Sequence, residues 1–132
     1  MPTTQELRAA ARALVLETVR EYYDETDTEI PKARSIAEAG GYCAYSASTG
    51  QHCAIGRLAP DAPWEEQERC LTGRNRDITI AAMRNRLGAP EGAHVDIWLG
   101  RVALQLQCIH DSPACMEHYR KIALEICDEV EL

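Results

Sequence analysis

Two cysteines, Cys43 and Cys53, have a type and spacing that could support chemistry. Thiolates bind zinc, which takes four tetrahedral ligands, and they also act as nucleophiles. Structural zinc pairs usually follow C-x2-C or C-x4-C, whereas nine residues separate this pair. Unreactive cysteine also packs as a small apolar side chain. We favour this core interpretation for the pair and keep metal binding and redox chemistry as alternatives.

A second group of potential ligands lies near the C-terminus, where Cys108 and His110 precede Cys115 and His118. Cys115 and His118 are three positions apart and would share one helical face, whereas Cys108 and His110 are two apart and diverge on a regular helix. We therefore expect no cofactor. Zinc held by these four side chains is the alternative.

His110 and Asp111 could also form a catalytic couple with Cys53 as the nucleophile. A carboxylate that fixes the tautomer of an imidazole makes it a general base, and such a base activates a thiol. Side chains that are adjacent in sequence usually point apart, however. The favoured interpretation is that Asp111 helps to cap the last helix and that His110 bonds a backbone carbonyl at the helix end.

Arginines are concentrated between residues 69 and 86, while the whole chain carries a formal charge of −7. Four of them could hold an anion such as a nucleotide phosphate at a helix N-terminus: Arg74, Arg76, Arg84 and Arg86. Solvated side chains on an exposed helix are the favoured interpretation. The acidic balance argues against non-specific binding of nucleic acid, which requires a basic surface.

The elements that position these residues are mostly helices. Thr3 and Glu6 form a capping box that starts an amphipathic helix running to about Tyr23. Two further apolar stripes, over 95–109 and 115–130, predict helices that pack as an antiparallel pair. Between them Ser112 is the expected N-cap, with Pro113 at the first helical position.

Shorter elements are expected in the middle of the chain. We predict helices over about 63–71 and 75–87, the first ended by Gly73 and the second by Gly88. Residues 42–56 read as a β-hairpin with a three-residue loop that ends at Gly50.

Strand alternation would place four side chains on one face of this hairpin: Cys43, Tyr45, Cys53 and Ile55. In this register Cys43 is diagonal to Cys53, at about 7–8 Å between backbones. That separation disfavours a disulfide.

The fold class that follows is mainly α (α+β), with one short antiparallel β-hairpin inserted after the N-terminal helices. We expect a single domain over 1–132, composed of N-terminal helices (1–41), the hairpin (42–56) and a helical part (57–132). The N-terminal segment lacks the basic start and apolar run of a signal peptide, and no apolar run is long enough to span a bilayer. We therefore expect a cytoplasmic protein without membrane contact, whose cysteines are thiols.

Two segments of the chain resemble a family of small, uncharacterised bacteriophage and prophage proteins. The first is Cys43-x-Tyr45, a Gly-containing loop, and then Cys53-Ala54-Ile55-Gly56-x-Leu58-x-Pro60-Asp61. The second is Leu106-Gln107-Cys108-Ile109-His110-Asp111 near a helix end. The two segments cover about a fifth of the chain, and the arginine-rich helices between them match nothing in the family. No activity comes with the resemblance, which implies a phage-type accessory protein.

By analogy, such a protein binds a host macromolecule and inhibits or redirects it, and we expect this target to be a protein, in some cases part of a defence system. The leading functional hypothesis is therefore a non-enzymatic interaction protein. The alternatives are a Cys/His-dependent protein, either a zinc site or an enzyme, and a binder of a small anionic nucleotide. The sequence specifies no oligomeric state.

Overall fold

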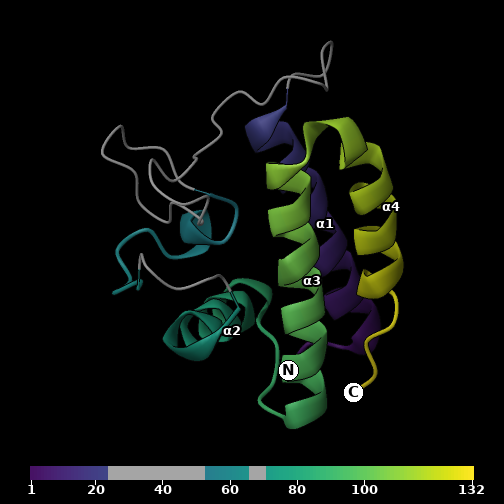
Figure 1. Cartoon of the computed structure of the whole chain (residues 1–132). Helices are drawn as coiled ribbons and strands as arrows, with labels where there is room; N and C mark the ends of the chain where they lie inside the picture. Colours follow the sequence, from purple (N-terminus) through teal and green to yellow (C-terminus); the bar gives the residue numbers. More distant parts are fainter. Residues whose placement is uncertain (24–52, 66–70) are drawn as a thin grey trace.

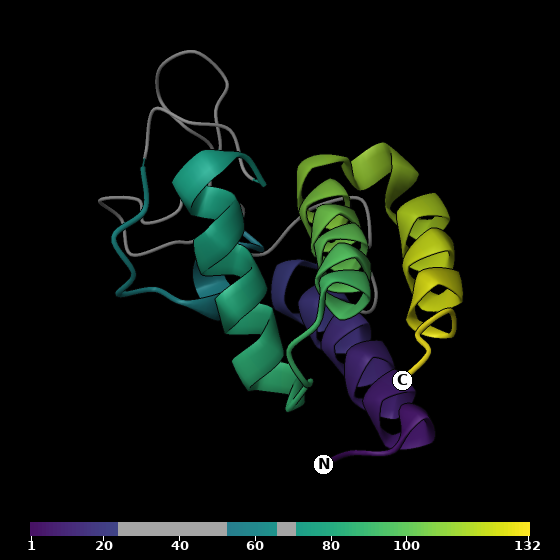
Figure 2. The ribbon, with the colours of Figure 1, turned by 90° about the horizontal axis from the view of Figure 1, so that it is seen from below.

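The computed structural model describes residues 1–23, 53–65 and 71–132. In these ranges the chain forms four α-helices and two short 3-10 helices: α1 (Thr4–Tyr22), η1 (Gly56–Leu58), α2 (Gly73–Leu87), α3 (Ala93–Asp111), η2 (Pro113–Cys115) and α4 (Met116–Cys127). The central helix is α3, which packs against each of the other three α-helices. Figure 1 shows α4 antiparallel to α3, as predicted, with α1 behind this pair, and Figure 2 shows α2 on the opposite side of α3 from α4.

Local sequence signals account for the ends of two helices. The side chain of Thr3 accepts from the Glu6 backbone N–H at 3.1 Å, and the Glu6 carboxylate accepts from the Thr3 N–H at the same distance. This is the predicted capping box of α1. Helix α2 ends at Gly88, whose φ of 67° is the left-handed conformation that favours glycine.

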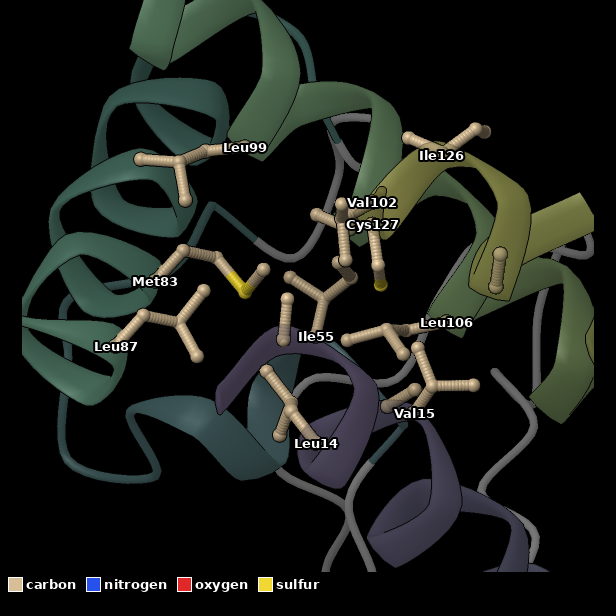
Figure 3. Close-up of a cluster of buried hydrophobic side chains, with 14 of the residues drawn as sticks. Leu14, Val15, Ile55, Met83, Leu87, Leu99, Val102, Leu106, Ile126 and Cys127 are labelled. Atoms are coloured by element: carbon tan, nitrogen blue, oxygen red, sulfur yellow. The ribbon is translucent and has the colours of Figure 1, made fainter. Parts of the chain in front are cut away.

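The core is a cluster of apolar side chains from all four α-helices. Helix α3 supplies the largest share, with the predicted stripe and in addition Ala103: Val95, Trp98, Leu99, Val102, Ala103, Leu106 and Ile109. Figure 3 shows Leu106 and Val102 of α3 near Val15 of α1, Met83 of α2 and Cys127 of α4. Each large side chain that is fully buried contributes about 1.5–3 kcal/mol of transfer free energy, so this cluster positions the helices.

The predicted β-hairpin is wrong in the part of the chain that the structure describes. No β-strand occurs in those residues, and the fold there is helical rather than α+β. Instead of extending, the backbone turns at Ile55 (φ −71°, ψ −48°), and the Arg57 N–H donates to the Cys53 carbonyl at 2.9 Å. This i→i+4 bond, together with the i→i+3 bond from the Leu58 N–H to the Ile55 carbonyl at 3.1 Å, satisfies backbone groups that a strand would have presented to a partner. Residues 42–52 of the predicted hairpin lie outside the described ranges.

The helix predicted over 63–71 is also wrong at both of its described ends. Trp64 is not helical, and Leu71 has a φ of 64°, which a continuing helix does not allow. The buried side chain of Asn75 explains the break on one side: its Oδ1 accepts from the Glu65 N–H and its Nδ2 donates to the Glu65 carbonyl, both at 2.9 Å. Residues 66–70 are not part of the described ranges.

The last helix begins where the sequence predicts, but as a 3-10 turn. Ser112 is the N-cap residue and Pro113 the first position of η2, yet the Ser112 side chain makes no capping hydrogen bond. The regular helix α4 then starts at Met116. Among the described helices, none combines the length and apolar character required to cross a membrane.

Candidate functional site

The two segments that carry the family resemblance meet at one end of α3. The Gln107 Oε1 atom accepts from the Ile55 N–H at 3.3 Å, across 52 positions of sequence. On the loop side, the Gly56 N–H donates to the Cys53 Sγ, also at 3.3 Å. Gln107 is 3 % exposed, and Cys53 and Ile55 are fully buried. The side chain of Gln107 therefore fastens the segment before η1 to the central helix.

His110 and Asp111 lie beside this contact and form a pair. The His110 Nδ1 atom is 2.7 Å from the Asp111 Oδ1, which also accepts from the Gln107 Nε2 at 2.9 Å. An ionised carboxylate can only accept, so Nδ1 is the donor in this contact. The imidazole is 1 % exposed and the Asp111 side chain 54 %.

This pairing differs from the interpretation favoured on sequence grounds. We expected adjacent side chains to diverge, with Asp111 as a cap of the last helix. Asp111 is instead the final residue of α3, so its carboxylate can return toward the same helix and meet both Gln107 and His110. Spacing arguments based on a continuous helix do not hold at a helix terminus.

Two aromatic residues at the end of α1 contact this end of α3. The Tyr22 ring meets the His110 ring edge-on, with centroids 4.7 Å apart and an interplanar angle of 84°. Burial raises the pKa of Tyr22 well above its ordinary value of 10. The hydroxyl of Tyr23 donates to the carbonyl of Ile109. Neither tyrosine was selected from the sequence, where the only signal was an aromatic pair at the predicted helix end.

Cys53 is poorly placed for the nucleophilic role considered from the sequence. The residue has no exposed surface, and its Sγ receives the Gly56 N–H. Among the described residues, no hydrogen bond joins this Sγ to the His110 ring. A thiol acts on a substrate only where the substrate can reach it. Cys43 and Tyr45, the remaining members of the motif, lie outside the described ranges.

The four candidate zinc ligands occupy different environments. His110 is buried, Cys108 is partly buried, and Cys115 and His118 are exposed. Across residues 1–23, 53–65 and 71–132, no three His, Cys, Asp or Glu side chains are grouped as metal ligands. The ring of His118 lies 5.6 Å from that of Tyr119.

Carboxylates offset the charge of three of the four candidate anion-binding arginines. Arg84 Nη2 is 2.5 Å from an Asp96 oxygen, and Arg86 is 2.5 Å from Glu17. Arg74 pairs with Glu65 at 3.2 Å. Arg76 is exposed and makes no ion pair to any described residue.

Glu17 connects α1 to two other elements. Its carboxylate accepts from Arg86 of α2 and, at 2.8 Å, from Arg57 of η1. These bonds, first that of Arg86 and then that of Arg57, lower the pKa of Glu17 below its ordinary value of 4.5. Arg57 also donates to the buried Thr18 hydroxyl at 3.2 Å. Sequence spacing carried no sign of this junction.

The outer side of α3 presents apolar side chains to solvent. Ile97 is 60 % exposed and Leu104 is 45 % exposed. Arg101 lies between them on the same helical face and pairs with Glu129. A hollow of about 220 Å³ next to Ile97 is lined by Trp98 and the ion pair, among others. The central helix therefore has a buried polar end and an exposed apolar side.

No family model matches this chain, and no significant match is found among curated proteins or solved structures.

Proposed function

We propose that this protein is a non-enzymatic, phage-type accessory protein that binds a host protein and inhibits or redirects it. The observation that carries the proposal is the burial of the motif side chains. Cys53 and His110 are fully buried, and Gln107 is 3 % exposed. Their polar atoms bond one another, neighbouring backbone or Asp111, so these residues support the fold rather than face a substrate.

The outer side of α3 is the proposed binding face. Ile97 and Leu104 are seven positions apart, two helical turns, and both are exposed. Arg101 lies between these two residues along α3, and its ion pair with Glu129 supplies polar contacts. Apolar side chains with a polar surround are typical of the centre of a protein-binding patch.

The bacterial host comes from the family resemblance alone. The motifs that carry it, residues 53–56 and 106–111, are in contact through Gln107 and Ile55. Such a contact is a physical reason for the two motifs to occur together in one family. It supports the resemblance without identifying the target.

The experiment is capture from bacterial lysate with the immobilised protein, quantified by mass spectrometry. The test variant is Ile97→Glu/Leu104→Glu. The matched control is Ala81→Glu, which adds charge at an exposed alanine of α2. We expect a specific host protein to be retained by the wild type and by the control, and to fall about tenfold or more with the double variant. Equal capture by all three proteins contradicts the proposed face.

A Cys/His-dependent protein is the second candidate, because the His110–Asp111 contact of 2.7 Å is the arrangement that orients a general base. His110→Gln separates the two candidates. The interaction proposal expects unchanged capture once folding is verified by circular dichroism. Loss of the protein's effect on its captured target, with capture and thermal midpoint preserved, favours the second candidate.

A further inference from the structure

Helix α2 enters the core with few apolar side chains. Five of its residues are buried: Asn75, Thr79, Ile80, Met83 and Leu87. The two polar ones bond within their own part of the chain. Thr79 Oγ1 donates to the Asn75 carbonyl at 2.7 Å, and the Asn75 side chain bonds the Glu65 backbone. Figure 3 shows Met83 and Leu87 extending from α2 into the core. Three buried apolar side chains therefore dock this helix.

Two ion pairs near the C-terminal end of α2 join it to other helices (the α2 ion pairs). Arg84 Nη2 is 2.5 Å from an Asp96 oxygen on α3, and Arg86 Nη2 is 2.5 Å from a Glu17 oxygen on α1. Among the described residues, α2 makes no other hydrogen bond to α1, α3 or α4. Both pairs are partly exposed, and such pairs contribute little stability compared with buried contacts.

The other three helices are joined by buried hydrogen bonds. The indole N–H of Trp98 on α3 donates to the Ile126 carbonyl on α4 at 2.7 Å. The hydroxyl of Tyr23, at the end of α1, donates to the Ile109 carbonyl on α3. Neither bond involves α2. Helices α1, α3 and α4 therefore form a three-helix bundle that is held together independently of α2.

The backbone at both ends of α2 suits a moving element. Leu71, two positions before α2, has a φ of 64°. This left-handed conformation is strained for a residue with a side chain and persists only where the surrounding structure imposes it. At the other end Gly88 has a φ of 67°, and Gly92 precedes α3. Release of α2 would relieve Leu71, and the two glycines supply a hinge.

We propose that α2 leaves the three-helix bundle as one unit, and that the α2 ion pairs hold it in the closed position. Opening breaks these pairs and the contacts of the three buried apolar side chains, while the bundle stays folded. It uncovers α3 at Gly100, where a Cβ atom would lie 3.6 Å from Ile80 Cδ1. This conformational device goes beyond the proposed function, which uses the outer side of α3.

Native-state hydrogen exchange of the full chain, at rising urea concentrations below the unfolding transition, is the first test. We expect the amides of residues 77–87 to share one opening reaction, with a smaller urea dependence than global unfolding. They should exchange about tenfold or more faster than the core amides of α3. Exchange of α2 only together with α3, or residue by residue from the helix ends, overturns the proposal.

Variants of one ion pair test what holds α2 closed. Arg84→Gln and Asp96→Asn remove the same pair from opposite helices, and each should speed the exchange of α2 relative to α4 about two- to fivefold. The double variant should be little faster than either single variant, because the pair is already lost. The matched control is Arg76→Gln, an exposed α2 arginine without an ion pair to any described residue, which should leave the ratio unchanged. Equal acceleration by the control, or none by the test variants, contradicts the role of the ion pair.

Gly100→Ala should act in the opposite direction. The added methyl group contacts Ile80 only while α2 is closed, whereas its effect on the helix propensity of α3 is the same in both positions. We expect the exchange of α2 to slow about twofold or more, because opening then also exposes this methyl group. An unchanged or faster exchange of α2 contradicts its undocking from α3.

Discussion

Replacing Gln107 with leucine tests whether the two motifs support the fold. The substitution keeps roughly the same volume and helix propensity but removes the acceptor of the Ile55 N–H. Ile55 has no exposed surface, so water does not replace the lost partner. An unpartnered buried N–H costs about 1–3 kcal/mol. The Asp111 oxygen also loses a donor, but that side chain is 54 % exposed and can bind water.

We therefore expect Gln107→Leu to lower the free energy of unfolding by about 2 kcal/mol. For a domain of this size, the thermal midpoint should fall by roughly 6–8 °C. Urea denaturation followed by circular dichroism gives the free energy, and calorimetry gives the midpoint.

Gln105 provides a matched control on the same helix. Its Oε1 atom is buried and has no hydrogen-bond partner in the described structure. Gln105→Leu removes no bond to that atom and should be neutral or slightly stabilising. A free energy of unfolding for Gln107→Leu within about 0.5 kcal/mol of the wild type, or an equal loss in both variants, contradicts a supporting role for the Gln107 bond.

Three further predictions concern a thiol, a carboxylate and a turn. Burial raises the pKa of Cys127 to about 12. At pH 8 a thiol reagent should therefore modify the exposed Cys115 before Cys127, which should react only on unfolding. Timed mass spectrometry measures the two rates, and equal rates would contradict the burial of Cys127. The pKa of Glu17 is lowered in the folded state, so its stabilisation is present above the ordinary value of 4.5 and is lost as pH falls through the folded pKa. Glu17→Gln should thus cost about 0.5–1 kcal/mol at pH 7 after allowance for solvent screening, with a difference that vanishes in acid; urea titrations at several pH values measure it. Gly88→Ala meets open space but keeps a φ of 67°, so it should cost about 1 kcal/mol in urea denaturation, and a cost above about 3 kcal/mol would show that packing, not backbone conformation, limits this position.

The helices that the sequence predicted correctly are those with complete local signals. α1 has its capping box at Thr3 and a long amphipathic stripe. α2 has Gly88 at its end, and α3 has an apolar repeat that runs from Val95 to Ile109. In these segments backbone bonds, caps and side-chain periodicity all favour the same conformation, so a local argument suffices.

The segment before η1 was predicted incorrectly because its pattern is too short to discriminate. Alternation over the few residues from Cys53 to Gly56 fits a buried turn as well as a strand. The deciding contact is the bond from the Ile55 N–H to Gln107, on a helix 52 positions away. The residues around Ile55 do not indicate this partner, because it lies on a helix that is distant in sequence.

The candidate site likewise contains residues that the sequence identified and residues that it did not. The sequence selected Cys53, Gln107 and His110 as members of one motif cluster, and the structure brings them to one end of α3. It did not select Tyr22 or Arg57, which reach the same region from α1 and η1. Long-range neighbours of this kind leave no spacing signal in the chain.

The sequence by itself determined where most of the helices lie, which faces are apolar and that the chain is acidic, because these properties depend on residues within a few turns of one another. Only the tertiary structure decided what the chemically capable side chains do. Cys53 and His110 are buried, and the Asp111 carboxylate contacts the His110 ring at the end of α3. Groups that could have been reactive are therefore part of a bonded internal cluster. The accessibility of a thiol or an imidazole is a property of packing between distant segments, and periodicity along the chain does not encode it.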